Sequence, residues 1–208
     1  MGKASNEEQA SVSALVGELA AATPPEGLEM DELFERIGRE GLLIAVMILT
    51  APFLLPVSIP GMSTPFGTLI ILICLSLVTG GPLRLPRRLG RLRVKQKHMR
   101  TIADKAGALL RRLEAWAKPR WGALTGTRTL RAAHAVGIVA GSVGMMLPLP
   151  MPLSNAIPAY AIVFFALGLL RRDGVLVLAG YGMLAATFLY LAVVYAAAFA
   201  GLRALLGG

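Results

Sequence analysis

The sequence predicts an all-α membrane protein: two repeated, proline-broken helical hairpins, a cytoplasmic or interfacial amphipathic helix between them, and one long C-terminal transmembrane helix. Three observations predict this fold class. The mean hydropathy of the 208 residues is +0.65. Only 16% of them are charged, compared with roughly 25% in a soluble domain. Finally, four short apolar runs are paired around two proline-rich segments, and a longer apolar run follows near the C-terminus.

The two proline-rich segments indicate an internal duplication. An offset of 92 residues superimposes two copies of an apolar run, a rigid proline turn and a second apolar run. The matching pairs are Pro56 with Pro148, Pro60 with Pro152, Ser63 with Asn155, Ile70 with Ile162, Leu75 with Leu167, Leu77 with Leu169, Arg36 with Arg128, and Arg39 with Arg131. The shared proline spacing and the paired arginines favour duplication over chance matches among apolar residues. We therefore divide the chain into an N-terminal segment, a hairpin, a linker, a second hairpin and a C-terminal helix, at 1–40, 41–83, 84–131, 132–172 and 173–208.

The N-terminal segment, 1–40, contains three basic and nine acidic residues. We expect a short helix over 5–22, ended by Pro24 and Pro25, and a second amphipathic segment from Glu29 that lies at the membrane surface. An acidic, polar start is unlike a cleavable signal peptide, so none is predicted.

The two hairpins have short limbs. Their apolar runs cover 42–55, 66–79, 135–147 and 159–170, so each reaches roughly 21 Å or less, short of the roughly 30 Å hydrocarbon core. Either the hairpins are re-entrant and their turns stop inside the bilayer, or they cross it fully and the turn supplies the missing length. The pattern favours re-entrant or partly broken limbs, because two facing turns would cover each other's polar backbone.

The linker, 84–131, contains fifteen basic and two acidic residues. A basic loop between apolar segments is the usual cytoplasmic retention signal, so we expect no nucleic-acid partner despite the high isoelectric point. The spacing predicts an amphipathic helix over 98–118, packed on anionic headgroups or on the acidic N-terminal segment. The residues expected to contact lipid headgroups are Arg111, Arg112, Trp116, Lys118 and Trp121.

The last apolar run, 175–200, is about 39 Å long as a helix and spans the membrane in every interpretation. Positive charge places the linker and the N-terminus in the cytoplasm. Both hairpins then open toward the cytoplasm, which predicts a parallel repeat about an axis along the membrane normal and a C-terminus on the far side.

Few groups are available for chemistry. Between 41 and 83 the one ionisable side chain is Cys74, and between 132 and 170 it is His134, tyrosine apart. A single cysteine excludes a disulfide framework, and no catalytic, cofactor or metal motif is found, so no enzyme, cofactor or metal is predicted. The absence of buried Asp, Glu or Lys also argues against an ordinary ion-coupled pump. The expected charges at the membrane entrance are Arg36, Arg39, Arg128, Arg131 and His134.

The turns supply the remaining polarity. We expect Ser63 and Asn155 to cap the limbs that follow the turns, with Pro65 and Pro158 in the first helical turn. Helix N-termini in a low dielectric can hold an anion or a headgroup phosphate. Capping and tight packing alone would explain the same residues. The candidate polar site comprises Pro56, Ser58, Pro60, Ser63, Thr64, Pro148, Pro152, Ser154 and Asn155.

Small residues favour close helix packing in the second hairpin. Gly137, Gly141 and Gly144 are spaced so that another helix can approach closely. The contact lies either within the fold, which is the commoner case, or across the seam of a homodimer.

The segments 51–61, 85–89 and 169–174 resemble the bacterial exopolysaccharide-synthesis family ExoD. The likeness extends over about 28–200 and includes the acidic lead, the proline-rich hairpin, the Pro86-Arg87-Arg88 sequence and the second hairpin. The resemblance implies an inner-membrane protein that takes part in exopolysaccharide production, and, in rhizobia, in nodule invasion and alkali tolerance. It supplies no catalytic residues.

Two functions are therefore expected. The first is an inner-membrane protein that binds or translocates a small anion, a polar solute or a lipid headgroup at the paired turns. The alternative is a scaffold that does not transport and recruits anionic lipid or synthesis partners through its basic linker. The sequence leaves the substrate and the oligomeric state open.

Overall fold

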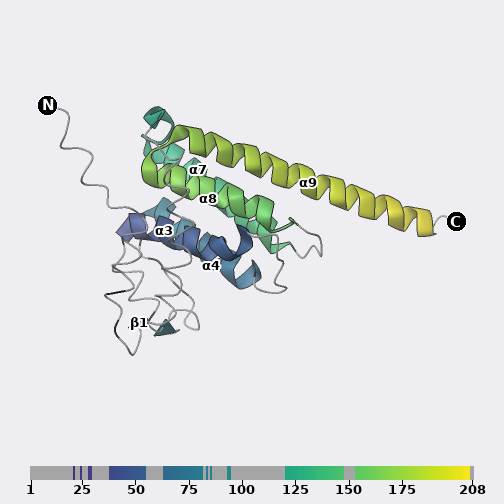
Figure 1. Ribbon diagram of the computed structural model, residues 1–208, viewed down its shortest axis with the longest axis horizontal. Coiled ribbons are helices and arrows are strands. Elements are labelled where there is room, and N and C mark those ends of the chain that lie inside the picture. The colour runs from purple at the N-terminus through teal and green to yellow at the C-terminus, as the bar shows by residue number, and fades with distance from the viewer. Residues whose placement is uncertain are drawn as a thin grey trace.

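The computed structural model of the chain is a bundle of helices, from which the last helix extends well beyond the others (Figure 1). It describes residues 38–54, 63–81, 120–147 and 153–206, together with 21, 24, 28–29, 83, 85 and 93–94. The predicted helix over 98–118 and nearly all of that over 5–22 lie outside the described residues. Within them, the helical class is confirmed.

The described elements are mainly helices. A single antiparallel pair of two-residue strands joins the acidic lead to the basic linker, with Glu29 opposite Arg93. The elements are β1 (Leu28–Glu29), α3 (Gly38–Thr50), η1 (Ala51–Leu54), α4 (Ser63–Thr79), β2 (Arg93–Val94), η2 (Gly122–Leu124), α7 (Arg128–Met146), α8 (Ala156–Arg171) and α9 (Gly174–Leu206).

Helix α3 ends earlier than the apolar run predicts. The α-helix stops at Thr50, and a 3₁₀ turn continues over Ala51–Leu54. Pro52 explains the change, because its ring clashes with the carbonyl group of Ile48 and it has no N–H to donate. Helix α7 has Gly144 at the position 92 residues later and continues to Met146 without a break.

The helices pack in crossed pairs. Helix α3 packs on α8 and α4 packs on α7, while α9 lies along α8 and α7 (Figure 1). Glycines allow the closest approaches: a methyl group at Gly137 would lie 2.8 Å from Cζ of Phe165, and one at Gly180 would lie 3.0 Å from Cδ1 of the same ring. Phe165 therefore fills a space between α7 and α9 that both glycines leave open.

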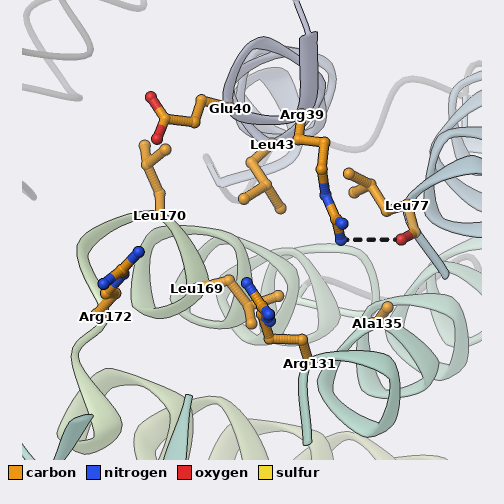
Figure 2. Close-up of a pocket in the computed structure, with 9 residues that line it drawn as sticks. All are labelled: Arg39, Glu40, Leu43, Leu77, Arg131, Ala135, Leu169, Leu170 and Arg172. Carbon is orange, nitrogen blue, oxygen red and sulfur yellow. Dashed lines mark hydrogen bonds between the residues drawn. The ribbon is translucent and has the colours of Figure 1, made fainter. Parts of the chain in front are cut away.

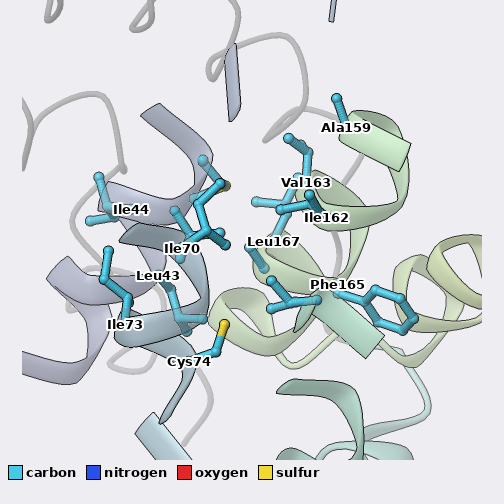
Figure 3. Close-up of a cluster of buried hydrophobic side chains, with 14 of the residues drawn as sticks. Leu43, Ile44, Ile70, Ile73, Cys74, Ala159, Ile162, Val163, Phe165 and Leu167 are labelled. Carbon is cyan, nitrogen blue, oxygen red and sulfur yellow. The ribbon is translucent and has the colours of Figure 1, made fainter. Parts of the chain in front are cut away.

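The core lies between the first hairpin and α8. Ile70 and Ile73 of α4 and Ile162 and Leu167 of α8 are completely buried, and Figure 3 shows Ile70 facing Ile162 and Leu167 between the two groups of helices. Cys74 lies in the same cluster, which is consistent with a packing role for this thiol.

Helix α9 has two different halves. Up to Leu191 it contributes buried residues such as Val177 and Thr187, whereas Val193 and Phe199 are exposed. Its segment Gly174–Gly201 is the one stretch of the described residues that is long and apolar enough to cross a membrane. The helices α4 and α8 are apolar but shorter.

Candidate functional site

Four helix ends meet at one end of the bundle. The first turns of α3 and α7 and the last turns of α4 and α8 all contribute to one pocket (Figure 2). Both hairpins are therefore open at the same end of the molecule. We call this the open-end pocket; its lining comprises Arg39, Glu40, Leu43, Leu77, Arg131, Ala135, Leu169, Leu170 and Arg172.

The open-end pocket is a hollow of about 180 Å³. This is enough for several water molecules or a small polyatomic ion. Figure 2 shows Arg39 and Arg131 reaching toward the same space from α3 and α7, while Arg172 extends from the end of α8. Leu43 and Ala135 are buried, whereas Arg39, Glu40, Arg131 and Arg172 are exposed, so the pocket combines exposed charges with buried apolar side chains.

Arg39 also stabilises the end of α4. Its Nη2 donates a hydrogen bond to the carbonyl oxygen of Leu77 across 3.0 Å. The last carbonyl groups of a helix have no partner within the helix, so this contact satisfies one of them with a positive charge that suits the helix dipole. Among the residues that the structure describes, neither Arg131 nor Arg172 has a carboxylate partner.

His134 lies one turn beyond Arg131, inside the bundle and only 3% exposed. Its Nε2 lies 2.8 Å from the carbonyl oxygen of Leu124, and its Nδ1 lies 3.0 Å from the hydroxyl group of Tyr181. A carbonyl oxygen can only accept, so Nε2 carries the hydrogen and Nδ1 accepts from Tyr181 in the neutral ring. Both nitrogens are therefore occupied in holding η2 and α9 against α7.

The aromatic rings around His134 complete this contact. Phe165 is stacked on the imidazole with ring centroids 6.3 Å apart, and Tyr181 meets Phe165 edge-on at 4.8 Å. In the described part of the chain, no group of three or more His, Cys, Asp or Glu side chains is arranged to hold a metal ion.

The turn residues lie at the opposite end of the hairpins. Ser63 begins α4, and Asn155 occupies the N-cap of α8, but its side chain makes no capping hydrogen bond. The expected cap at Asn155 is therefore wrong. Its backbone is already in the right-handed helical region, whereas a capping side chain usually needs an extended backbone to reach back to the N–H groups.

Other parts of the turns agree with expectation. Pro65 and Pro158 lie in the first turn of their helices, as predicted. Ser154 is buried, while Thr64 is exposed. The predicted turn residues Pro56, Ser58, Pro60, Pro148 and Pro152 lie outside the described residues.

Of the remaining predicted residues, some lie within the described ranges and the others lie outside them. Arg128 is exposed at the start of α7, and Trp121 is 63% exposed beside the start of α9. The structure thus brings Arg39 and Arg131 together at the open end and leaves Arg128 on the surface. Outside the described residues lie Arg36, Arg111, Arg112, Trp116 and Lys118.

The open-end pocket is not among the sites predicted from the sequence, although the internal duplication contains a signal for it. Two of the pairs related by the 92-residue offset, Arg39 with Arg131 and Leu77 with Leu169, line this one pocket. The offset also relates Leu43 to Ala135 in the lining. Paired arginines at equivalent positions could have been read as converging on a shared site.

Comparisons with known proteins agree with one another. A family model described as "Exopolysaccharide synthesis, ExoD" matches residues 12–193. The chain is 37% identical over 195 residues to Protein ExoD of Rhizobium meliloti, which covers 93% of this chain and 81% of that protein. It is 35% identical over 138 residues to an uncharacterized Synechocystis protein, covering 66% of this chain and 64% of the relative. No solved structure matches.

Proposed function

Because this chain belongs to the ExoD family of exopolysaccharide synthesis, we propose that it is an inner-membrane protein of that process with two re-entrant hairpins. The hairpins enter the bilayer from the cytoplasmic side and carry their turns into its interior. There the paired turns bind or translocate a small anion, a polar solute or a lipid headgroup. This assigns the polar residues of the turns, Ser63, Ser154 and Asn155, to the membrane-embedded site.

The observation that carries this proposal is the level of the turns along α9. A methyl group at Gly144, close to the end of α7, would lie 3.1 Å from Thr187 and 3.9 Å from Leu191 of α9. These residues are 13 and 17 positions after Gly174, or about 20–26 Å along the helix. Beyond Leu191, α9 continues for 15 residues, or about 22 Å.

The depth of the turns follows from these lengths. If the roughly 30 Å hydrocarbon core begins near Gly174, the turns reach about 20–26 Å into it and stop short of the far boundary. Helix α9 alone is long enough to complete the crossing. Exposed Trp121 packs beside Gly174, and interfacial Trp supports placing the open end at the headgroup layer.

The packing also supports a duplicated hairpin. Helices α3 and α4 correspond to α7 and α8 at the 92-residue offset, and their bounds agree within a few residues once η1 is added to α3. The two cross-hairpin contacts, α3 with α8 and α4 with α7, would exchange under a two-fold rotation. A parallel repeat about the membrane normal has this property.

Cysteine accessibility tests the depth of the turns. In a Cys74→Ala background, single cysteines at Ser63 and Asn155 are compared with one at Ala204, near the end of α9. A membrane-impermeant maleimide added from the periplasmic side should label Ala204→Cys and leave both turn positions unlabelled. Labelling of the turn cysteines as fast as the Ala204→Cys control would show crossing hairpins and refute the re-entrant arrangement.

The role of the turns is tested separately. Exopolysaccharide output is measured in cells whose own copy is replaced by the Ser63→Ala/Asn155→Ala double variant. We expect a large loss of output at normal protein levels, while Thr79→Ala, an exposed hydroxyl change at the open end of α4, retains it. Normal output from the double variant would exclude the turn site.

A second candidate function is the scaffold, favoured by the strand pair. Glu29 of the acidic N-terminal segment lies opposite Arg93 of the basic linker, so the two segments meet at this strand pair. A scaffold would use this surface to recruit anionic lipid or synthesis partners. Replacing Arg111 and Arg112 with Gln should then reduce exopolysaccharide output, whereas the turn variants should not.

A further inference from the structure

We propose that the open-end pocket binds a phosphate-type oxyanion, either free or as the phosphate monoester headgroup of a lipid. This site lies at the opposite end of the hairpins from the turns. It therefore stands or falls independently of the function proposed above.

The first argument is the donor set. Arg39, Arg131 and Arg172 come from three different elements and reach one pocket. A guanidinium group presents a fixed fork of N–H donors that matches the oxygens of phosphate, and it keeps its charge at any physiological pH. Because Arg39 uses Nη2 on Leu77, its position is fixed while its other N–H groups remain available.

The second argument is the charge balance. Among the described residues that line the pocket, three carry a guanidinium group and one, Glu40, carries a carboxylate, which gives these residues a formal net charge of +2. Figure 2 shows the Glu40 carboxylate at the edge of the pocket, on the side away from Arg39 and Arg131. The three arginines are exposed, but like charges that line one hollow still repel one another, and a bound dianion would reduce that repulsion.

The third argument is the apolar part of the lining. Leu43 and Ala135 line the same pocket and are buried, whereas the three arginines are exposed, so the ligand would contact guanidinium groups on one side and apolar side chains on another. The apolar side chains exclude water from part of the ligand, which favours charge-assisted hydrogen bonds there. The volume of about 180 Å³ accommodates a phosphate group.

The fourth argument is the arrangement of the lining. The pairs Arg39 with Arg131, Leu43 with Ala135 and Leu77 with Leu169 are each 92 residues apart. The pocket thus lies where the two hairpins meet with equivalent positions facing each other. Arg172 has no such counterpart, since the offset relates it to Gly80, and it adds a third guanidinium group to an otherwise paired site.

Calorimetric titration of the full chain in a non-ionic detergent tests the proposal. The probes are inorganic phosphate, dihexanoyl-phosphatidic acid and, as a zwitterionic control, dihexanoyl-phosphatidylcholine. Each of Arg131→Gln and Arg172→Gln should weaken binding of the anionic probe by roughly 10- to 100-fold, because each removes a charge-assisted contact. The matched control is Arg203→Gln, an exposed arginine on α9, which should leave binding unchanged.

The outcomes separate the sources. Binding of inorganic phosphate assigns a free ion, and binding of phosphatidic acid without inorganic phosphate assigns a lipid headgroup. Arg131→Lys, which retains the charge but loses the fork, should bind with intermediate affinity. Failure of both anionic probes to bind, or binding that is unchanged in the two Gln variants at preserved melting temperature, overturns the proposal.

Discussion

The hydroxyl group of Tyr181 in α9 lies 3.0 Å from Nδ1 of His134 in α7. The other ring nitrogen of His134 donates to the carbonyl oxygen of Leu124 in η2. One imidazole thereby joins the long C-terminal helix, the second hairpin and the end of the linker. The contact is at the open end of the bundle, close to the arginines that line the pocket.

Replacing Tyr181 with Phe should lower the stability of the protein. The substitution keeps the ring that packs on Phe165 and leaves Nδ1 of buried His134 without a hydrogen-bond donor, which typically costs about 1–3 kcal/mol. Thermal unfolding in detergent should show a lower melting temperature. Tyr195→Phe is the control, because this side chain is similarly exposed, 49% compared with 39% for Tyr181, but lies on the far half of α9, away from His134. Equal melting temperatures for the two variants would contradict the assigned role of the pair.

A methyl group at Gly137 should disturb the contact between α7 and α8. It would lie 2.8 Å from Cζ and 2.9 Å from Cε2 of Phe165, whose buried ring also contacts His134 and Tyr181. Overpacking of this kind costs about 1–3 kcal/mol.

Gly182→Ala provides the matched comparison, since nothing lies within 4 Å of a methyl group there. It should be neutral or gain about 0.5–1 kcal/mol from helix propensity. Measured side by side, the melting temperature of Gly137→Ala should fall below that of the parent, whereas that of Gly182→Ala should equal or exceed it. A destabilised Gly182→Ala with an unaffected Gly137→Ala would refute this packing.

Asp173 begins α9 by capping it. Its Oδ1 accepts hydrogen bonds from the backbone N–H groups of Val175 at 2.9 Å and Leu176 at 3.4 Å. Asp173→Ala removes this acceptor and should cost about 1 kcal/mol, within a range of about 0.5–2 kcal/mol.

Asp173→Asn is a conservative comparison, because the amide oxygen can accept the same bonds. It should retain more of the melting temperature than Asp173→Ala. If both variants melt at the same reduced temperature, the charge of Asp173 matters more than its capping geometry.

The sequence predicted the starts of α4 and α8 better than the start of α7. Helices α4 and α8 begin at Ser63 and Ala156, at or next to the residues Ser63 and Asn155 that were expected to open them. Helix α7 begins seven residues before the predicted 135 and includes Arg131 and His134. The first turn of α7 is polar, so a hydropathy pattern places the start of the helix too late. The helix begins earlier because the side chain of Thr127 caps it by accepting a hydrogen bond from the N–H of Leu130.

The open-end pocket could not be predicted from the sequence alone, because its formation depends on how the helices pack. Arg39 and Arg131 were recognised as charges at the membrane entrance, but their convergence requires α3 to pack on α8 and α4 on α7. Burial of His134 likewise requires Tyr181, which lies 47 residues away in the sequence. The pocket forms where the apolar runs end, on residues that are distant from one another in the sequence.

The two halves of α9 should differ in how freely they accept mutation over evolutionary time. Before Leu191, Gly180 faces the Phe165 ring at 3.0 Å, and even a single added carbon would need a compensating change in α8. Beyond Leu191, nothing lies within 4 Å of a methyl group at Gly201. Substitutions of one apolar residue by another in this half therefore disturb no packing contact. The sequences of homologous chains should therefore diverge fastest in the half of α9 beyond Leu191, while its hydrophobicity and length are retained.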